Sequence, residues 1–213
     1  MQKFNDYDTT KVNDFGERLK LGGHICKVLE AKVESGTSKK DGKPYEMLVI
    51  KFDIEEPDEQ AGFYNKKFVE AARTDPMTAK WKGYYRLSVP NDNSEDFIKK
   101  TFKTFTTSIE KSNPGYTWNW QEDTLVGKKF GGVFGYEEFT IPTTGETVPL
   151  TRIRFIRSTE KIEEAPIPKV KLLDKTYVDY DKYVENRKNG NTTESNNNSE
   201  ESGFIGDNDD LPF

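Results

Sequence analysis

Aromatic and basic residues are interleaved through the middle of the sequence, and these two residue types together can bind a nucleic acid. Flat rings stack on bases, while lysine and arginine neutralise phosphates. The mixture is densest in residues 57–82 and continues at alternating positions of three expected strands. We predict a binding surface formed by Tyr45, Lys51, Lys66, Lys67, Trp81, Lys82, Tyr84, Arg86, Arg152 and Arg154. Such a surface suits a single strand, whose bases are open to stacking.

Each group of candidates also has a structural alternative. The aromatic residues of the 57–82 connection could pin this segment to the sheet instead of binding bases. Arg152 and Arg154 could be surface partners of Glu137 and Glu138 on the adjoining strand. A second packed layer could cover the outward face of the second strand. A shift of one residue in strand register would also move every candidate on that strand to the core side.

The end of the chain has a second, different chemistry. It follows a run of Asn, Ser, Thr and Glu in residues 189–202, a composition that cannot form a packed core. Acids there can meet a basic surface, proline restricts the backbone, and the terminal phenylalanine offers a ring and the α-carboxylate to a pocket. The residues concerned are Asp207, Asp209, Asp210, Leu211, Pro212 and Phe213. We expect this tail to bind a partner protein; the alternative is a frayed, solubilising terminus.

Asp209-Asp210-Leu211-Pro212-Phe213 resembles the acidic, Pro-Phe-terminated tail of bacterial and phage single-stranded DNA-binding proteins. The resemblance covers only the tail, and Leu211 stands where the bacterial tail usually has Ile. The long Asn/Ser linker and the larger body are more similar to the phage-encoded members. The resemblance implies a protein that coats single-stranded DNA in replication, recombination or repair and recruits replication and recombination proteins through its tail.

The charge is distributed unevenly along the 213 residues. The net charge is −5 and the mean hydropathy is −0.87, with 33% hydrophobic residues, which allows one domain plus tails. Residues 189–213 contain six acids and no lysine or arginine, which leaves 32 basic and 31 acidic residues in the remainder. A body that is nearly neutral can still carry a basic surface, because affinity for phosphates depends on local patches.

Few residues could support catalysis or hold a metal. Cys26 is the one cysteine and His24 the one histidine, so neither a disulfide framework nor a zinc site is expected. We interpret these two residues, which a strand would place on one face, as a packing arrangement. The acids of residues 53–59 could bind Mg²⁺ in a nuclease, but they are more typical of a solvated loop. We therefore expect no enzymatic activity, no cofactor and no structural metal.

The sequence contains no apolar run long enough to cross a bilayer. The N-terminal residues Met1 to Asp6 also lack the apolar core of a signal peptide. We expect a soluble cytoplasmic protein without a membrane partner, located in the bacterial host cytoplasm if it is phage-encoded. A homo-oligomer is left open.

Alternating apolar residues indicate five strands. In the second of them, Leu48, Ile50, Phe52 and Ile54 are expected to face the core. A helix is expected after the third strand, with Asn93 or Ser94 as its cap, an apolar stripe at three- and four-residue spacing, and an end at Asn113-Pro114-Gly115. The expected strands span residues 25–34, 45–56, 83–89, 127–140 and 150–159.

This order of elements predicts a mainly β fold, a five-stranded oligonucleotide/oligosaccharide-binding (OB) barrel. The helix lies between strands 3 and 4, and a long connection joins strands 2 and 3. The predicted organisation is an N-terminal arm in residues 1–20, the OB domain with a C-terminal extension in 21–184, and a disordered linker with the acidic tail in 185–213. The function predicted for it is sequence-nonspecific binding of single-stranded DNA. The alternative is an OB-fold protein-interaction adaptor without strong single-strand binding.

Overall fold

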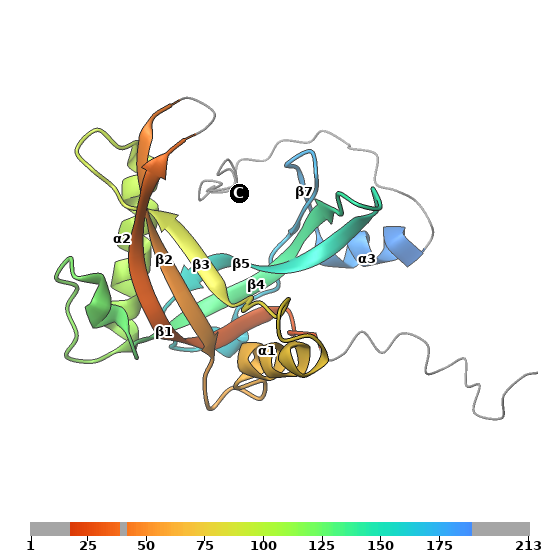
Figure 1. Cartoon of the computed structure of the whole chain (residues 1–213), viewed down its shortest axis with the longest axis horizontal. Helices are drawn as coiled ribbons and strands as arrows, with labels where there is room; N and C mark the ends of the chain where they lie inside the picture. Colours follow the sequence, from red (N-terminus) through yellow and green to blue (C-terminus); the bar gives the residue numbers. More distant parts are fainter. Residues whose placement is uncertain (1–17, 39–41, 189–213) are drawn as a thin grey trace, which may run out of the picture.

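The computed structural model describes residues 18–38 and 42–188, which form a mostly antiparallel sheet with helices packed around it (Figure 1). The strands are β1 (Gly22–Thr37), β2 (Pro44–Ile54), β3 (Tyr84–Ser88), β4 (Lys129–Thr140), β5 (Thr147–Arg157), β6 (Val170–Lys171) and β7 (Tyr177–Val178). The helices are α1 (Phe63–Thr74), α2 (Asp96–Ser112) and α3 (Tyr180–Lys188), with two 3₁₀ turns, η2 (Glu122–Leu125) and η3 (Ile162–Glu164). The described chain is therefore mixed α/β, and the predicted order of five strands with a helix after the third is confirmed.

The sheet is open in the described part of the chain. Its strand order is β3-β2-β1-β4-β6-β7, and β5 pairs with β4. All pairs are antiparallel except β4 with β6, which is joined through Glu137 and Lys171. No pairing between β3 and β5 closes a barrel among these residues. The predicted count of five strands was wrong because β6 and β7 have two residues each, too few for an alternating pattern.

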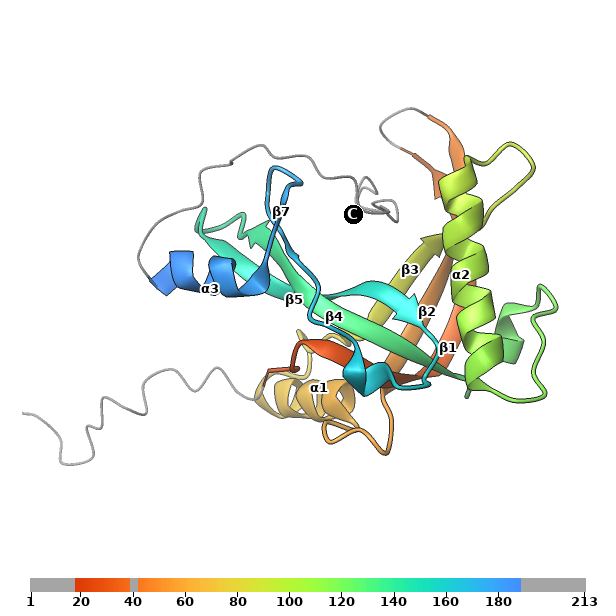
Figure 2. The ribbon, with the colours of Figure 1, turned by 180° about the vertical axis from the view of Figure 1, so that it is seen from behind.

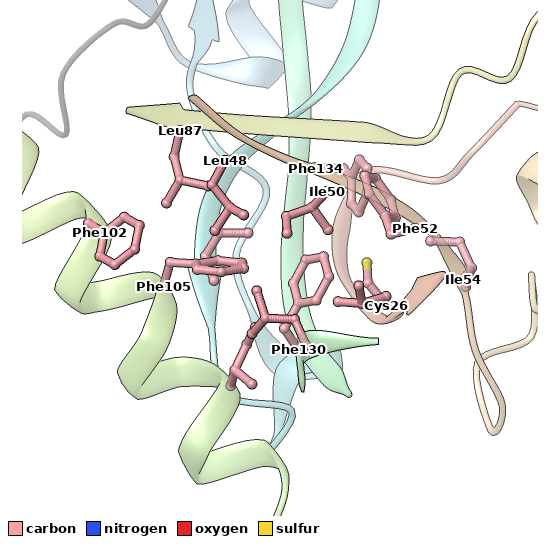
Figure 3. Close-up of a cluster of buried hydrophobic side chains, with 14 of the residues drawn as sticks. Cys26, Leu48, Ile50, Phe52, Ile54, Leu87, Phe102, Phe105, Phe130 and Phe134 are labelled. Atoms are coloured by element: carbon pink, nitrogen blue, oxygen red, sulfur yellow. The ribbon is translucent and has the colours of Figure 1, made fainter. Parts of the chain in front are cut away.

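The core lies on one side of the curved sheet, between the sheet and α2 (Figure 3). All four side chains predicted to face inward from β2 are buried, but Met47 and Val49 on its other face are buried too, so burial in β2 does not alternate and part of the outward face is covered. From α2, Phe102, Phe105 and Ile109 enter the same cluster, because their three- and four-residue spacing places them on one side of the helix. Leu19, at the end of the predicted N-terminal arm, is also buried in this cluster.

The start of α2 differs from the prediction. Glu95 is the N-cap residue, and it makes no side-chain capping hydrogen bond. The Ser94 hydroxyl instead accepts a hydrogen bond from the Asn91 amide (2.8 Å), because residues 91–94 form a turn of their own. The predicted end of the helix is confirmed, and Asn113 donates from its side chain to the carbonyl oxygens of both Ile109 (2.7 Å) and Lys129 (2.8 Å). The end of α2 is thereby joined to β4.

The glycines of β1 and β4 allow the C-terminal extension to pack against the outside of the sheet. A Cβ atom on Gly23 would lie 1.7 Å from the backbone oxygen of Ile162, and one on Gly131 would lie 2.7 Å from the Ser158 oxygen. No side chain fits in these gaps. Residues 158–164 are therefore in direct backbone contact with the sheet, which positions η3 against β1 and β4.

Asp53 connects the sheet to the long segment between β2 and β3. Its side chain is buried, and its carboxylate accepts hydrogen bonds from the amides of Ile54 (2.8 Å), Tyr64 (2.8 Å) and Asn65 (3.1 Å). The last two amides belong to the first turn of α1, where backbone N–H groups have no partner within the helix. A negative charge is favourable at this end of a helix. The carboxylate therefore holds α1 on β2.

We predict that Asp53→Ala lowers the free energy of unfolding by about 2–3 kcal/mol, because two helix amides lose a charged acceptor inside the protein. Asp53→Asn keeps the shape and one acceptor oxygen, so its loss should be smaller. Urea unfolding followed by circular dichroism measures both variants. Equal stability of Asp53→Ala and the parent would contradict the assigned role of this carboxylate.

Candidate nucleic-acid interface

The side of β1, β2 and β3 that faces away from the core carries four of the ten predicted binding residues. In the β2–β3 ladder Lys51 lies opposite Tyr84 and Val49 lies opposite Arg86. Residues directly opposite each other in neighbouring strands share a face, so the strand register gathers these side chains on one surface. We call this surface the outer face; its residues are Glu30, Lys32, Glu34, Tyr45, Met47, Val49, Lys51, Tyr84, Arg86 and Ser88. Of these, Met47 and Val49 are buried.

Aromatic rings and cations are neighbours on the outer face. The Arg86 guanidinium lies 5.9 Å from the centre of the Tyr84 ring, and the Lys51 ammonium lies 4.9 Å from the centre of a Trp81 ring. Tyr84 is 44% exposed, so one of these rings is open to a ligand. At the other end of β2, the Tyr45 side chain covers Gly36, where a Cβ atom would be 2.6 Å from the Tyr45 hydroxyl. Ring and charge are thus held together as the sequence predicted.

Trp81 also anchors the connection that carries it. Its indole N–H donates to the carbonyl oxygens of Phe52 (3.2 Å) and Gly83 (3.1 Å), and its ring lies 5.9 Å from that of Phe68 on α1. The structural alternative for this aromatic residue is therefore confirmed. The ring is fixed beside Lys51, where it forms an edge of the outer face.

Lys32 and Glu34 are outer-face residues that the sequence prediction missed. Their side chains form an ion pair of 2.7 Å, and hydrogen bonding to Glu34 raises the pKa of Lys32. The same hydrogen bond lowers the pKa of Glu34, and the charge of Arg86 adds to this effect. The alternation of charged with apolar residues from 30 to 34 marks both residues as outward facing. The pairing of β1 with β2, and of β2 with β3, places both residues near Tyr84 and Arg86.

The three predicted lysines of the segment between β2 and β3 differ in their position relative to the outer face. Lys66 and Lys67 belong to α1, and Lys67 lies 3.3 Å from Glu70. Within the described ranges, no hydrogen bond, ion pair or ring contact joins either of them to the outer face. Lys82 is exposed between Trp81 and Gly83, next to Tyr84 in the chain, and so borders the outer face.

The two predicted arginines of β5 have different surroundings. The Arg154 guanidinium lies 3.7 Å from the Glu137 carboxylate and donates a hydrogen bond to the Tyr177 hydroxyl (3.2 Å). Lys171, which is buried, lies 3.1 Å from the same carboxylate. The alternative that pairs these arginines with acids of the adjoining strand is confirmed for Arg154, which is held in this ion-pair network. Arg152 is exposed.

Arg152 lies opposite Gly135 in the β4–β5 ladder. Burial raises the pKa of Tyr64, as do the nearby Cys26 and Asp53, whereas the charge of Arg152 lowers it. Arg154, in contrast, is held by Glu137 and Tyr177, and the ladder register shifts between Val133 and Phe134, opposite this part of β5. The structure therefore separates the two arginines by environment, although the sequence predicted one shared face for them.

His24 and Cys26 each make their side-chain contacts with other groups. The His24 ring lies between two other groups, with Nδ1 2.9 Å from the Asp58 carboxylate and Nε2 donating to the Lys20 carbonyl (2.9 Å). The Cys26 thiol is completely buried and lies 3.9 Å from the His24 carbonyl oxygen. The packing interpretation of this pair agrees with these contacts. In residues 18–38 and 42–188, no three His, Cys, Asp or Glu side chains are grouped to hold a metal ion, and no helix is long and apolar enough to cross a membrane.

We predict that Cys26 resists thiol reagents in the folded protein. Burial raises the pKa of its thiol well above the ordinary value, so little of the reactive thiolate forms. A chromogenic disulfide reagent should react slowly with the native chain and release one equivalent rapidly in urea. Rapid stoichiometric reaction without denaturant would mean that this part of β1 opens readily.

The predicted partner-binding tail, Asp207 to Phe213, lies outside the described residues. No protein-family model matches the chain, and no curated protein sequence matches it. Function is therefore inferred from the residues of this chain and their geometry.

Proposed function

We propose that this protein binds single-stranded DNA without reading its sequence and that the outer face is the binding surface. The observation that carries the proposal is the direct pairing of an exposed ring, Tyr84, with Lys51 across the β2–β3 ladder and with Arg86 beside it. Rings stack on any base, and cations neutralise phosphates regardless of sequence. A surface of this composition therefore favours strand binding that tolerates any sequence.

The strand order supports the finer proposal of an OB-type architecture. Read from β4, the strands lie in the order β4-β1-β2-β3, which is the spatial order of a Greek key, and α2 follows β3. An OB fold is a partly open, five-stranded Greek-key barrel in which the face of strands 2 and 3 binds oligonucleotides. In this chain the corresponding strands carry Tyr84, Arg86 and Lys51. We propose β6, β7 and α3 as additions to that architecture.

We predict that Tyr84→Ala weakens binding of a homopyrimidine oligonucleotide by about 1–3 kcal/mol, the range found when a stacking ring is removed. Tyr84→Phe retains the ring and should bind like the parent. Trp120→Ala removes a more exposed ring that stacks on Phe102 of α2, outside the outer face, and should also bind like the parent. Fluorescence anisotropy of a labelled oligonucleotide at low salt measures all three.

Two results would count against the proposal. If the parent does not bind the oligonucleotide at low salt, single-strand binding is excluded and the adaptor function becomes the better explanation. If Tyr84→Ala binds as tightly as Tyr84→Phe, the outer face is not where bases stack.

We also propose that the acidic tail recruits replication, recombination or repair proteins to the bound DNA. The tail is joined to the domain by a polar run, and residues 189–213 carry six acids and no basic residue. An anionic segment tethered in this way reaches a cationic surface of its own chain at a high effective concentration. It therefore competes with DNA for the outer face, and binding of a strand releases it.

Deletion of Asp207 to Phe213 should leave oligonucleotide affinity unchanged or raise it, most clearly at low salt, where the competition is least screened. Partner capture should be lost. Phe213→Ala removes the pocket-filling ring without changing the charge, so it should abolish capture while leaving the salt dependence of DNA binding as in the parent. Pull-down from a bacterial lysate beside an oligonucleotide titration tests both effects. Loss of DNA binding with capture intact would assign the tail to the nucleic-acid site instead.

A further inference from the structure

A second basic surface lies on the helix side of the molecule, away from the residues assigned to the outer face. It is a groove of about 600 Å³ between α2, the end of β5 and the segment that leads into η3. Figure 2 shows α2 beside the end of β5 from behind. The basic residues that line it are Lys100, Lys103, Lys111, Arg157 and Lys161. Glu160 is the one carboxylate among its described lining residues.

The spacing along α2 builds one wall of the groove. The groove residues of α2 are spaced by one, three or four positions, which places them on one side of the helix. They are Lys100, Lys103, Thr104, Thr107 and Lys111. From the first to the last lysine this row is about 16 Å long at 1.5 Å per residue. A row of that length spans several successive phosphates of a strand.

The five cations of this groove form no ion pair with any acid of the described residues. In the part of the chain that the structure describes, no carboxylate lies within 4 Å of any of them. Elsewhere on the surface the pattern differs: Lys27 and Lys129 both lie beside Glu55, at 3.3 and 3.8 Å. Cations that are not neutralised by neighbouring acids keep their charge available to a ligand. The groove is therefore a surface of high local positive charge.

The floor of the groove is held in place by hydrogen bonds between its two walls. The Thr159 amide donates to the Ser112 hydroxyl (3.0 Å), which donates to the Ser108 carbonyl (2.6 Å). On the other side, the close approach of Gly131 to Ser158 and Ile162 fixes the same segment against β4. These contacts therefore fix the positions of Arg157 and Lys161 relative to the lysines of α2.

We propose that this groove binds the phosphate backbone of a single DNA strand, as a second contact beyond the outer face. No aromatic residue is among its described lining residues, so it offers charge and hydroxyl groups but no stacking platform. Phosphates, which are present in every nucleotide, suit it better than bases. The inference rests on the proposed function, because it assigns the groove to the same ligand. A long strand contacts both surfaces, whereas a short one occupies the outer face alone.

The test uses the full chain and two homopyrimidine oligonucleotides of about 10 and about 40 nucleotides, the shorter within the range that one OB fold covers. The triple variant Lys100→Gln/Lys103→Gln/Lys111→Gln removes three charges from the groove. A matched control, Lys169→Gln/Lys175→Gln/Lys182→Gln, removes three exposed charges from the C-terminal extension. Thermal unfolding verifies that both variants fold.

For the long oligonucleotide, the groove variant should lose about 2 units from the slope of log affinity against log salt, at about 0.7 per phosphate contact. Its deficit relative to the parent should therefore be roughly tenfold larger at 50 mM than at 200 mM salt. The control should match the parent, and both variants should bind the short oligonucleotide like the parent.

Three results would overturn this inference. If the groove variant binds the long strand like the parent at every salt concentration while the parent binds well, the proposed function stands and the groove assignment fails. If it binds DNA normally but loses affinity for a synthetic peptide of residues 203–213, the groove holds an acidic peptide. If the parent binds neither oligonucleotide, the proposed function itself fails and the groove has no DNA ligand.

Discussion

The buried carboxylate of Asp53 is the interaction on which the arrangement of the outer face depends. Removing a carboxylate from water is costly, and the cost is offset here by three backbone N–H donors and by the positive end of α1. With α1 held on β2, Phe68 supports the Trp81 ring, and the Trp81 indole bonds back to the Phe52 carbonyl. Asp53 and Lys51 lie on the same side of β2, two residues apart, so this buried polar contact fixes an aromatic ring at the edge of the outer face, next to Lys51.

Two surfaces of different chemistry result from this fold. The outer face combines rings with cations, and part of its charge is balanced internally, since Lys32 is paired with Glu34. The groove beside α2 has cations and hydroxyl groups, and its five basic residues have no carboxylate within 4 Å among the described residues. The first surface is suited to hold bases and the second to hold phosphates. Each can be altered by substitution of exposed residues, so their contributions are separable.

The sequence predicted those features that depend on local periodicity. Alternation located the inward residues of β2, and the spacing of Phe102, Phe105 and Ile109 located the buried side of α2. It also selected Tyr84 and Arg86 as outward facing. Periodicity does not predict which distant strands pair. Arg154 contacts Glu137 because β4 pairs with β5, and it contacts Tyr177 because of the position of β7. The groove was missed for the same reason, because its charges come from segments some 50 residues apart along the chain.

The acidic net charge of the chain is compatible with two sites for a polyanion because the field of a protein depends on where its charges lie. Outside the acidic tail the basic and acidic residues nearly balance, yet five cations with one carboxylate line a single groove. Acids must therefore be concentrated elsewhere, and one such place is the segment after β2, where Glu55 lies beside Lys27 and Lys129. The charges of the cations beside that segment are largely balanced by these acids. The field of the body therefore attracts phosphates more strongly to the groove than to that segment. This separation of basic from acidic surface regions would orient a bound strand along the molecule through its phosphates, without any contact to its bases.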